Sequence, residues 1–144
     1  MARVPYLTPE DLKPEDRELL KRPIALARAL ANAPGAARAF HGLGHWIRYD
    51  SKVDPRLREL AILQVGYLAR SPYEWSHHVK IGFDFGVTEA DVRGLMADSE
   101  GRLNDLDPLA RTVLRGAREI AADGGMKEDT FAALEAAIGR EQTI

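Results

Sequence analysis

Four places in this chain combine a helix-capping side chain with a proline directly behind it. They are Thr8–Pro9, Asp54–Pro55, Ser71–Pro72 and Asp107–Pro108. An N-cap oxygen accepts a backbone N–H of the first helical turn, and proline is tolerated at the first helical position because its missing N–H would have no partner there. The repeated pair predicts a chain that begins one helix after another, and no segment shows the sustained alternation of a β-strand.

Other boundary signals complete an all-α prediction. One helix is expected to stop at Pro34–Gly35, and a further helix is expected after it. Thr88 and Asp91 have the spacing of a capping box. We expect a single domain over residues 1–144 with about seven or eight helices.

The two central helices are expected to form an antiparallel hairpin. The first starts behind Asp54 and the second is capped by Ser71, so that Arg70 and Ser71 are nearly all that separates them. Apolar residues cover most of the circumference of the first helix: Leu57, Leu60, Ala61, Leu63, Val65 and Leu68. Such a helix is buried by its neighbours or by another subunit, and we expect a homo-oligomer.

Composition narrows the chemistry. The 144 residues include four histidines and no cysteine, and the net charge is −2. The lack of cysteine excludes a thiolate nucleophile, an iron–sulfur cluster and a cysteine zinc site. The charge balance gives no basic field for nucleic acid, and no apolar run approaches the ~20 residues of a membrane span. The N-terminal segment has no apolar signal region, so a cytoplasmic protein is expected.

The candidate acid–base residues lie in "SPYEWSHHVKIG", Ser71 to Gly82. Glu74 precedes His78 by four residues, which places both on one helix face, whereas His77 points about 100° away. Glu74 also has the spacing of a capping box with Ser71, in which its carboxylate bonds back to the Ser71 amide. His78 has its own alternative, a core histidine with one hydrogen bond. Spacing alone leaves both pairs of alternatives open.

The preceding helix adds a second group of candidates. Arg56 and Arg58 are candidates for binding a substrate carboxylate, and Glu59 stands at the edge of an apolar run. The alternative is a solvated first turn in which Arg56 pairs with Glu59. In a straight hairpin, Glu59 lies roughly 7 Å further from the turn than His78 at ~1.5 Å per residue, so Glu74 is expected to be the closer partner of His78. Tyr73 and His77 are further candidates for substrate contact.

"DPRLRELAILQVGYLARSPYEWSHHVKIGFDFGVTEADV" resembles the core of the carboxymuconolactone decarboxylase superfamily, which includes the alkylhydroperoxidase D-like proteins. The resemblance covers residues 48–96. The peroxidase relatives have Cys-x-x-Cys-x-x-x-His here, with a glutamate upstream. Laid on this chain, Ser71 and Glu74 take the cysteine positions, and His78 and Glu59 match the histidine and the upstream glutamate. Glu74 with His78 instead matches the Glu-x-x-x-His of the decarboxylase branch.

The resemblance implies an alkylhydroperoxidase D-like helical protomer that assembles into trimers or hexamers. It implies a lyase without cofactor or metal, in which His78, Glu74 and Glu59 carry protons for a small carboxylated lactone or oxo acid of aromatic-compound catabolism. An isomerase, hydratase or hydrolase on the same scaffold, or a non-catalytic oligomeric binding protein, remains an alternative. Thiol peroxidase activity is not expected, because neither Ser71 nor Glu74 supplies a thiolate.

Overall fold

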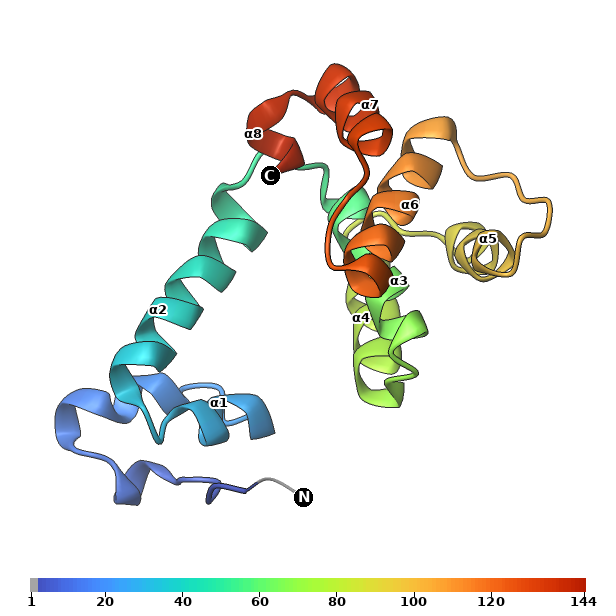
Figure 1. Cartoon of the computed structure of the whole chain (residues 1–144). Helices are drawn as coiled ribbons and strands as arrows, with labels where there is room; N and C mark the ends of the chain where they lie inside the picture. Colours follow the sequence, from blue (N-terminus) through green and yellow to red (C-terminus); the bar gives the residue numbers. More distant parts are fainter. Residues whose placement is uncertain (1–2) are drawn as a thin grey trace. The chain divides into compact units, whose positions relative to one another are not determined.

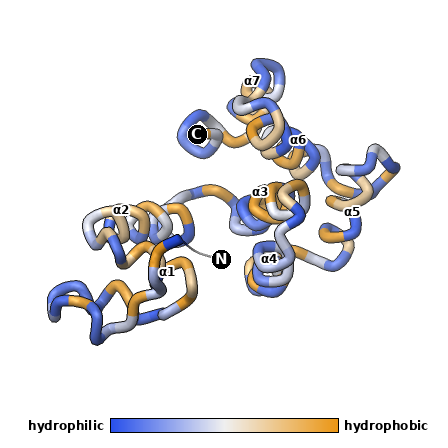
Figure 2. Tube along the Cα trace, turned by 60° about the horizontal axis from the view of Figure 1, so that its bottom comes forward, coloured by the Kyte–Doolittle hydropathy of each residue, from blue (hydrophilic) through white to orange (hydrophobic). Residues whose placement is uncertain are grey.

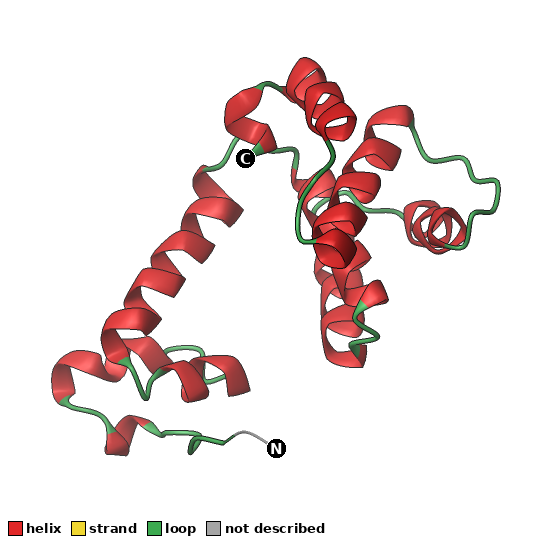
Figure 3. Cartoon of the chain, in the orientation of Figure 1, coloured by secondary structure: helices red, strands yellow, loops and turns green. Residues whose placement is uncertain are grey.

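The computed structural model describes residues 3–144, and this part of the chain is helical and without a strand (Figures 1 and 3). The predicted all-α fold class is therefore confirmed, with eight α-helices within the described range. The chain divides into two compact units, Met1–Ser51 and Lys52–Ile144. A single domain over residues 1–144 stays a prediction. None of the described helices is both long and apolar enough to cross a bilayer.

The first unit consists of short elements followed by one longer helix. In chain order these are the 3-10 turns η1 (Pro9–Asp11) and η2 (Pro14–Leu20), α1 (Ala25–Leu30), α2 (Pro34–His45) and the π-helical segment η3 (Trp46–Asp50). Their core is small and made of Leu12, Leu20, Ala27 and Ala31. The sequence suggests a stop at Pro34–Gly35, but Pro34 is the first residue of α2, a position that suits its fixed φ.

The second unit is built around α3 (Pro55–Leu68), which packs against three other helices, α4 (Pro72–Asp84), α5 (Glu89–Ser99) and α6 (Pro108–Asp123). Two helices follow, α7 (Glu128–Ile138) and α8 (Arg140–Thr143). α7 packs against α6, and α8 packs against α7. The neighbours α4, α5 and α6 lie around part of α3 (Figure 2), whereas its Val65 and Leu68 side chains stay exposed. Leu60, Leu63, Leu95 and Leu114 are fully buried in the shared core.

The predicted start signals of this unit are used as expected. Asp54, Ser71, Thr88 and Asp107 each accept a backbone N–H from the first turn of the following helix. Thr88 and Asp91 form the reciprocal capping box that their spacing predicts. The hairpin of α3 and α4 is confirmed, and α3 thus becomes the element against which the site residues are positioned (Figure 1).

The turn between α3 and α4 is a Schellman motif. The Ser71 N–H donates to the Gly66 carbonyl at 3.1 Å, and the Arg70 N–H donates to the Tyr67 carbonyl at 3.1 Å. Arg70 adopts φ 48° to close the turn, and it is the one non-glycine residue with positive φ in the described chain. A side chain in this left-handed region is strained, because its Cβ approaches the following carbonyl oxygen.

Replacing Arg70 by glycine is expected to stabilise the protein. Arg70→Gly removes the Cβ strain at the left-handed position, and the free energy of unfolding should rise by about 1 kcal/mol. Arg70→Ala is the matched control, because it removes the charge and keeps the Cβ, and it should give no such gain. Urea unfolding followed by circular dichroism measures both, and equal stabilities of the two variants would contradict the strain at Arg70.

Candidate active site

Two glycines bring α3 and α4 close together at the site. A Cβ on Gly66 in α3 would lie 3.4 Å from the Cβ of Glu74, and a Cβ on Gly82 in α4 would lie 3.7 Å from the Cβ of Glu59. Both distances are ordinary contact or closer, so each glycine leaves a bare strip of helix surface facing a glutamate. Glu59 on α3 therefore lies next to Gly82 of α4, and Glu74 on α4 lies next to Gly66 of α3.

Glu59 forms a direct hydrogen bond with His78. Its Oε2 lies 2.8 Å from Nδ1 of the imidazole, and both residues are buried, with exposed fractions of 0% for Glu59 and 9% for His78. The expectation that Glu74 is the closer partner is wrong. The axial offset of roughly 7 Å is bridged because the Glu59 side chain extends past the bare surface of Gly82 toward His78, one helical turn away.

Glu74 lies on the other side of the same ring. Its Oε2 is 3.5 Å from Nε2 of His78, and its side chain is 47% exposed. The imidazole thus lies between a buried carboxylate and an exposed one. Its Nδ1 hydrogen is donated to Glu59, which leaves Nε2 as the atom that faces Glu74.

The capping-box alternative for Glu74 is not what the structure has. The Glu74 N–H donates to Ser71 Oγ at 3.4 Å, so the backbone half of the cap is present. The Ser71 N–H, however, is already donated to the Gly66 carbonyl in the Schellman motif. No amide is left there for the Glu74 carboxylate, which turns toward His78 instead.

Arg58 completes the charged cluster. Its Nε donates to Oε1 of Glu59 at 3.2 Å, and its guanidinium lies 4.8 Å from the centre of the Phe85 ring. Burial acts to raise the pKa of Glu59, but the hydrogen bonds from His78 and Arg58 outweigh it and hold that pKa below its ordinary value of 4.5. Glu59 is therefore an ionised carboxylate at neutral pH, and it fixes the orientation of the His78 ring.

The cluster borders a groove of about 560 Å³ within the second unit. Arg58, Ser71 and Glu74 line it on the side of α3 and α4. Further lining on and beside α3 is apolar: Val53, Leu57, Ala61, Ile62, Val65, Gly66 and Ala69. The rest comes from the last three helices and the α6–α7 turn: Val113, Ala117, Ile120, Met126, Leu134, Ile138, Gln142 and Thr143. The exposed carboxylate of the Glu59–His78–Glu74 chain thus faces a space large enough for a small molecule.

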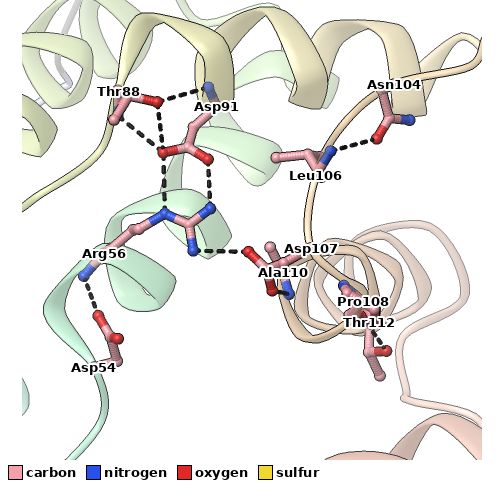
Figure 4. A network of polar contacts seen from close by, with 10 residues as sticks. All are labelled: Asp54, Arg56, Thr88, Asp91, Asn104, Leu106, Asp107, Pro108, Ala110 and Thr112. Atoms are coloured by element: carbon pink, nitrogen blue, oxygen red, sulfur yellow. Dashed lines mark hydrogen bonds and ion pairs between the residues drawn. The ribbon is translucent and has the colours of Figure 1, made fainter.

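The other candidate residues lie elsewhere. Arg56 is an ion-pair partner of Asp91 and Asp107, and it joins the N-terminal ends of α5 and α6 to α3 (Figure 4). Its hydrogen bond lowers the pKa of Asp91 below the ordinary value, as expected for a structural ion pair. Tyr73 and His77 stack on each other with ring centres 5.6 Å apart. None of these three candidates lines the groove.

The sequence interpretation missed the far wall of the groove and the two glycines. A signal for the wall exists, because Val113, Ala117 and Ile120 repeat at helical spacing along α6. Which neighbour that apolar face meets depends on tertiary packing, and periodicity does not supply it. Within residues 3–144, no three or more His, Asp or Glu side chains are grouped so as to hold a metal ion.

Residues 34–102 match the model of the carboxymuconolactone decarboxylase family. This part of the chain is similar to that family. A search of curated proteins and a search of solved structures each returned no match. Glu59, Glu74 and His78 all lie within the range that matches the carboxymuconolactone decarboxylase family, whereas α6, α7 and α8 lie beyond it. The family resemblance predicted from the sequence is confirmed, and the far wall of the groove comes from outside the matched region.

Removing the charge of Glu59 is expected to destabilise the fold in a pH-dependent way. Glu59→Gln leaves His78 and Arg58 without their buried anion, and the free energy of unfolding at pH 7 should fall by about 2–3 kcal/mol. Because the pKa of Glu59 is lowered in the folded state, its stabilising contribution is complete above the ordinary value of 4.5 and is lost as the pH falls through the folded-state value.

The stability difference between wild type and Glu59→Gln should therefore shrink on acidification below pH 4.5. Urea unfolding of both proteins across this range measures it. Glu89→Gln is the matched control, because Glu89 is a helical glutamate whose side chain is 79% exposed, and it should change stability little at any pH. A constant difference between wild type and Glu59→Gln at all pH values would contradict the assignment.

Proposed function

We propose that the protein is a cofactor-free lyase of the carboxymuconolactone decarboxylase type, which removes CO₂ from a carboxylated lactone or oxo acid by proton transfer at Glu74 and His78. The observation that supports this most directly is the position of Glu74. Its carboxylate lines the groove and lies 3.5 Å from Nε2 of His78. A cytoplasmic enzyme of aromatic-compound catabolism is the setting that this proposal implies.

Glu74 and His78 are suited to share one proton. The Nδ1 hydrogen of His78 is committed to Glu59, so the ring exchanges its second proton through Nε2. That proton lies either on Nε2 or on the neighbouring Glu74 carboxylate. The buried Glu59 carboxylate fixes the ring through its Nδ1 hydrogen, as a carboxylate does behind a catalytic histidine in general. The pair therefore offers a proton at the groove and recovers it from solvent through exposed Glu74.

The reaction follows from this arrangement. The bond between the carboxylate carbon and its neighbour breaks, CO₂ leaves, and the electron pair moves into the conjugated carbonyl of the substrate to form an enolate. The Glu74–His78 pair then delivers its proton to the substrate carbon. The carbonyl group of the substrate accepts the electrons, so the step involves no net oxidation or reduction.

Arg58 is the better of the two candidate arginines for binding the substrate. It lines the groove, whereas Arg56 is engaged by Asp91 and Asp107. A guanidinium binds a carboxylate or stabilises an enolate oxygen through its fixed array of N–H donors. In this proposal Glu74 and His78 are the catalytic pair, Arg58 binds the anion, and Glu59 is a positioning residue.

Charge removal at either member of the pair should abolish most turnover. With a panel of carboxylated lactones and oxo acids, we expect Glu74→Gln and His78→Gln each to reduce CO₂ release about 100-fold or more. The double variant should be no worse than the poorer single variant, because the two groups act as one unit. The backbone cap at Ser71 does not use the Glu74 carboxylate, so Glu74→Gln should unfold at nearly the wild-type urea concentration.

His77→Gln is the control for this experiment. His77 is the neighbouring residue on the same helix, it stacks on Tyr73, and it does not line the groove. It should keep wild-type activity and stability. Full turnover by a folded Glu74→Gln protein would exclude the proposed role of the carboxylate.

We further propose that the functional form is a homo-oligomer, a trimer or hexamer as the family resemblance implies. Unit 1 carries large apolar side chains that its own small core does not cover: Phe40, Leu43, Trp46, Ile47 and Tyr49 on α2 and η3. Large contiguous apolar surface of this kind is typical of association sites. We propose a second copy of the chain as the partner that covers this surface, because the family resemblance implies a homo-oligomer.

Light scattering at micromolar concentration should report a mass that is a multiple of the 15.9 kDa chain. Leu43→Glu places a charge at a position that is 59% exposed and should shift the mass toward the monomer. Ala36→Glu, at an exposed position near the start of the same helix and without a large apolar side chain, is the control and should keep the wild-type mass. A 15.9 kDa species in the wild type would contradict the oligomer.

A further inference from the structure

The groove is larger than a small carboxylated lactone requires. Its volume of about 560 Å³ falls within the range of roughly 300–1,000 Å³ that surrounds drug-sized ligands. Water occupies about 30 Å³ per molecule in the liquid, so the groove holds on the order of twenty waters. A lactone of about a dozen non-hydrogen atoms would leave much of that water against apolar walls, at a cost in free energy.

The groove is mostly apolar, and its charged groups are confined to one part of it. The charged residues among its described lining are Arg58 and Glu74, and both stand on the α3–α4 side. The lining from α6, α7 and the turn between them is apolar: Val113, Ala117, Ile120, Met126, Leu134 and Ile138. The short helix α8 adds two uncharged polar residues, Gln142 and Thr143. A ligand that satisfies both sides has one anionic or carbonyl end and an apolar remainder.

We propose that the substrate is an amphiphilic carboxylic acid, with its carboxylate at Arg58 beside Glu74 and an alkyl chain or ring system along the α6–α7 wall. This inference deepens the proposed function, since it uses the same acid–base pair and names the substrate class. The wall lies outside residues 34–102, so the family match does not assign it.

The charges that line the groove favour a small acid over a segment of another protein chain. The Arg58 side chain is 7% exposed, and it shares the groove with Glu74, the outermost carboxylate of the His78 cluster. A covering polypeptide would bury Glu74 and separate it from solvent, whereas a carboxylate head complements Arg58 and leaves the rest of the ligand to the apolar wall. A second copy of the chain in the groove is therefore the alternative outcome of the test.

The test is a homologous series of saturated straight-chain carboxylates, from butanoate to dodecanoate, titrated into the full chain by calorimetry; these acids have no carbonyl that could accept the electrons of a lost CO₂, so the heats report binding alone. Each methylene transferred from water to the wall should tighten binding by about twofold to fourfold until the groove is filled. The heat-capacity change of binding should become more negative along the series. Affinity independent of chain length would overturn the proposal.

Two tryptophan variants test whether the acids bind in the groove. Ala117 lines the groove, and Ala117→Trp should block it and remove the dependence on chain length. Ala121→Trp is the control, because Ala121 is an exposed alanine on the same helix and outside the groove. It should retain the full dependence. Arg58→Gln should weaken all members of the series by one constant factor and leave the increment per methylene unchanged.

The outcomes separate this inference from the proposed function. Binding that strengthens with chain length but without CO₂ release from any carboxylated lactone or 3-oxo acid would sustain the apolar wall and refute the lyase. Turnover of small acids with no chain-length dependence would sustain the lyase and refute the amphiphilic substrate. If Ala117→Trp lowers the mass measured by light scattering and wild-type binding shows no chain-length dependence, the groove is an interface between copies, and the proposal is wrong.

Discussion

The hydrogen bond between Glu59 and His78 is the contact on which the site depends. Burying a carboxylate fully is costly unless it is paired, and Glu59 is paired twice, with His78 and with Arg58. Gly82 allows the close packing around this bond, because a Cβ there would lie 3.1 Å from Val87 and 3.7 Å from the Cβ of Glu59. A larger residue at that position would push Val87 away and crowd Glu59. Close helix packing thus comes first, and the electrostatics of the site follow from it.

The turn between α3 and α4 determines what Glu74 is available to do. The Schellman motif uses the Ser71 N–H to satisfy the end of α3, and the Ser71 hydroxyl satisfies the start of α4. One residue therefore serves two helix ends. Glu74 stands at the position where a glutamate ordinarily completes a capping box, but its acceptor capacity remains for His78. The hydrogen bond from the Ser71 N–H to the Gly66 carbonyl therefore leaves the Glu74 carboxylate available to His78 at the groove.

The sequence predicts the helices of the second unit well because each start has a local cause, such as Asp54, Thr88 or Asp107 at an N-cap. It also singles out Glu59 and Glu74 beside His78. It ranks the two glutamates incorrectly, since axial distance along ideal helices takes no account of a glycine on the facing helix. Whether Glu74 caps or pairs depends on one amide hydrogen bond across the turn, and sequence spacing is the same in both cases.

Different helices supply the candidate proton-transfer residues and the apolar lining of the groove. The residues to which we assign proton transfer lie within the stretch that matches the carboxymuconolactone decarboxylase family, on the hairpin of α3 and α4. The apolar wall belongs to α6 and α7, which reach the hairpin through packing against α3 and α6 respectively. Changes in wall side chains such as Ile120 or Ile138 alter the shape of the groove without touching the Glu59–His78 bond. In our proposal the same hairpin is therefore compatible with different substrates, and the α6–α7 segment is the part of this chain that selects among them.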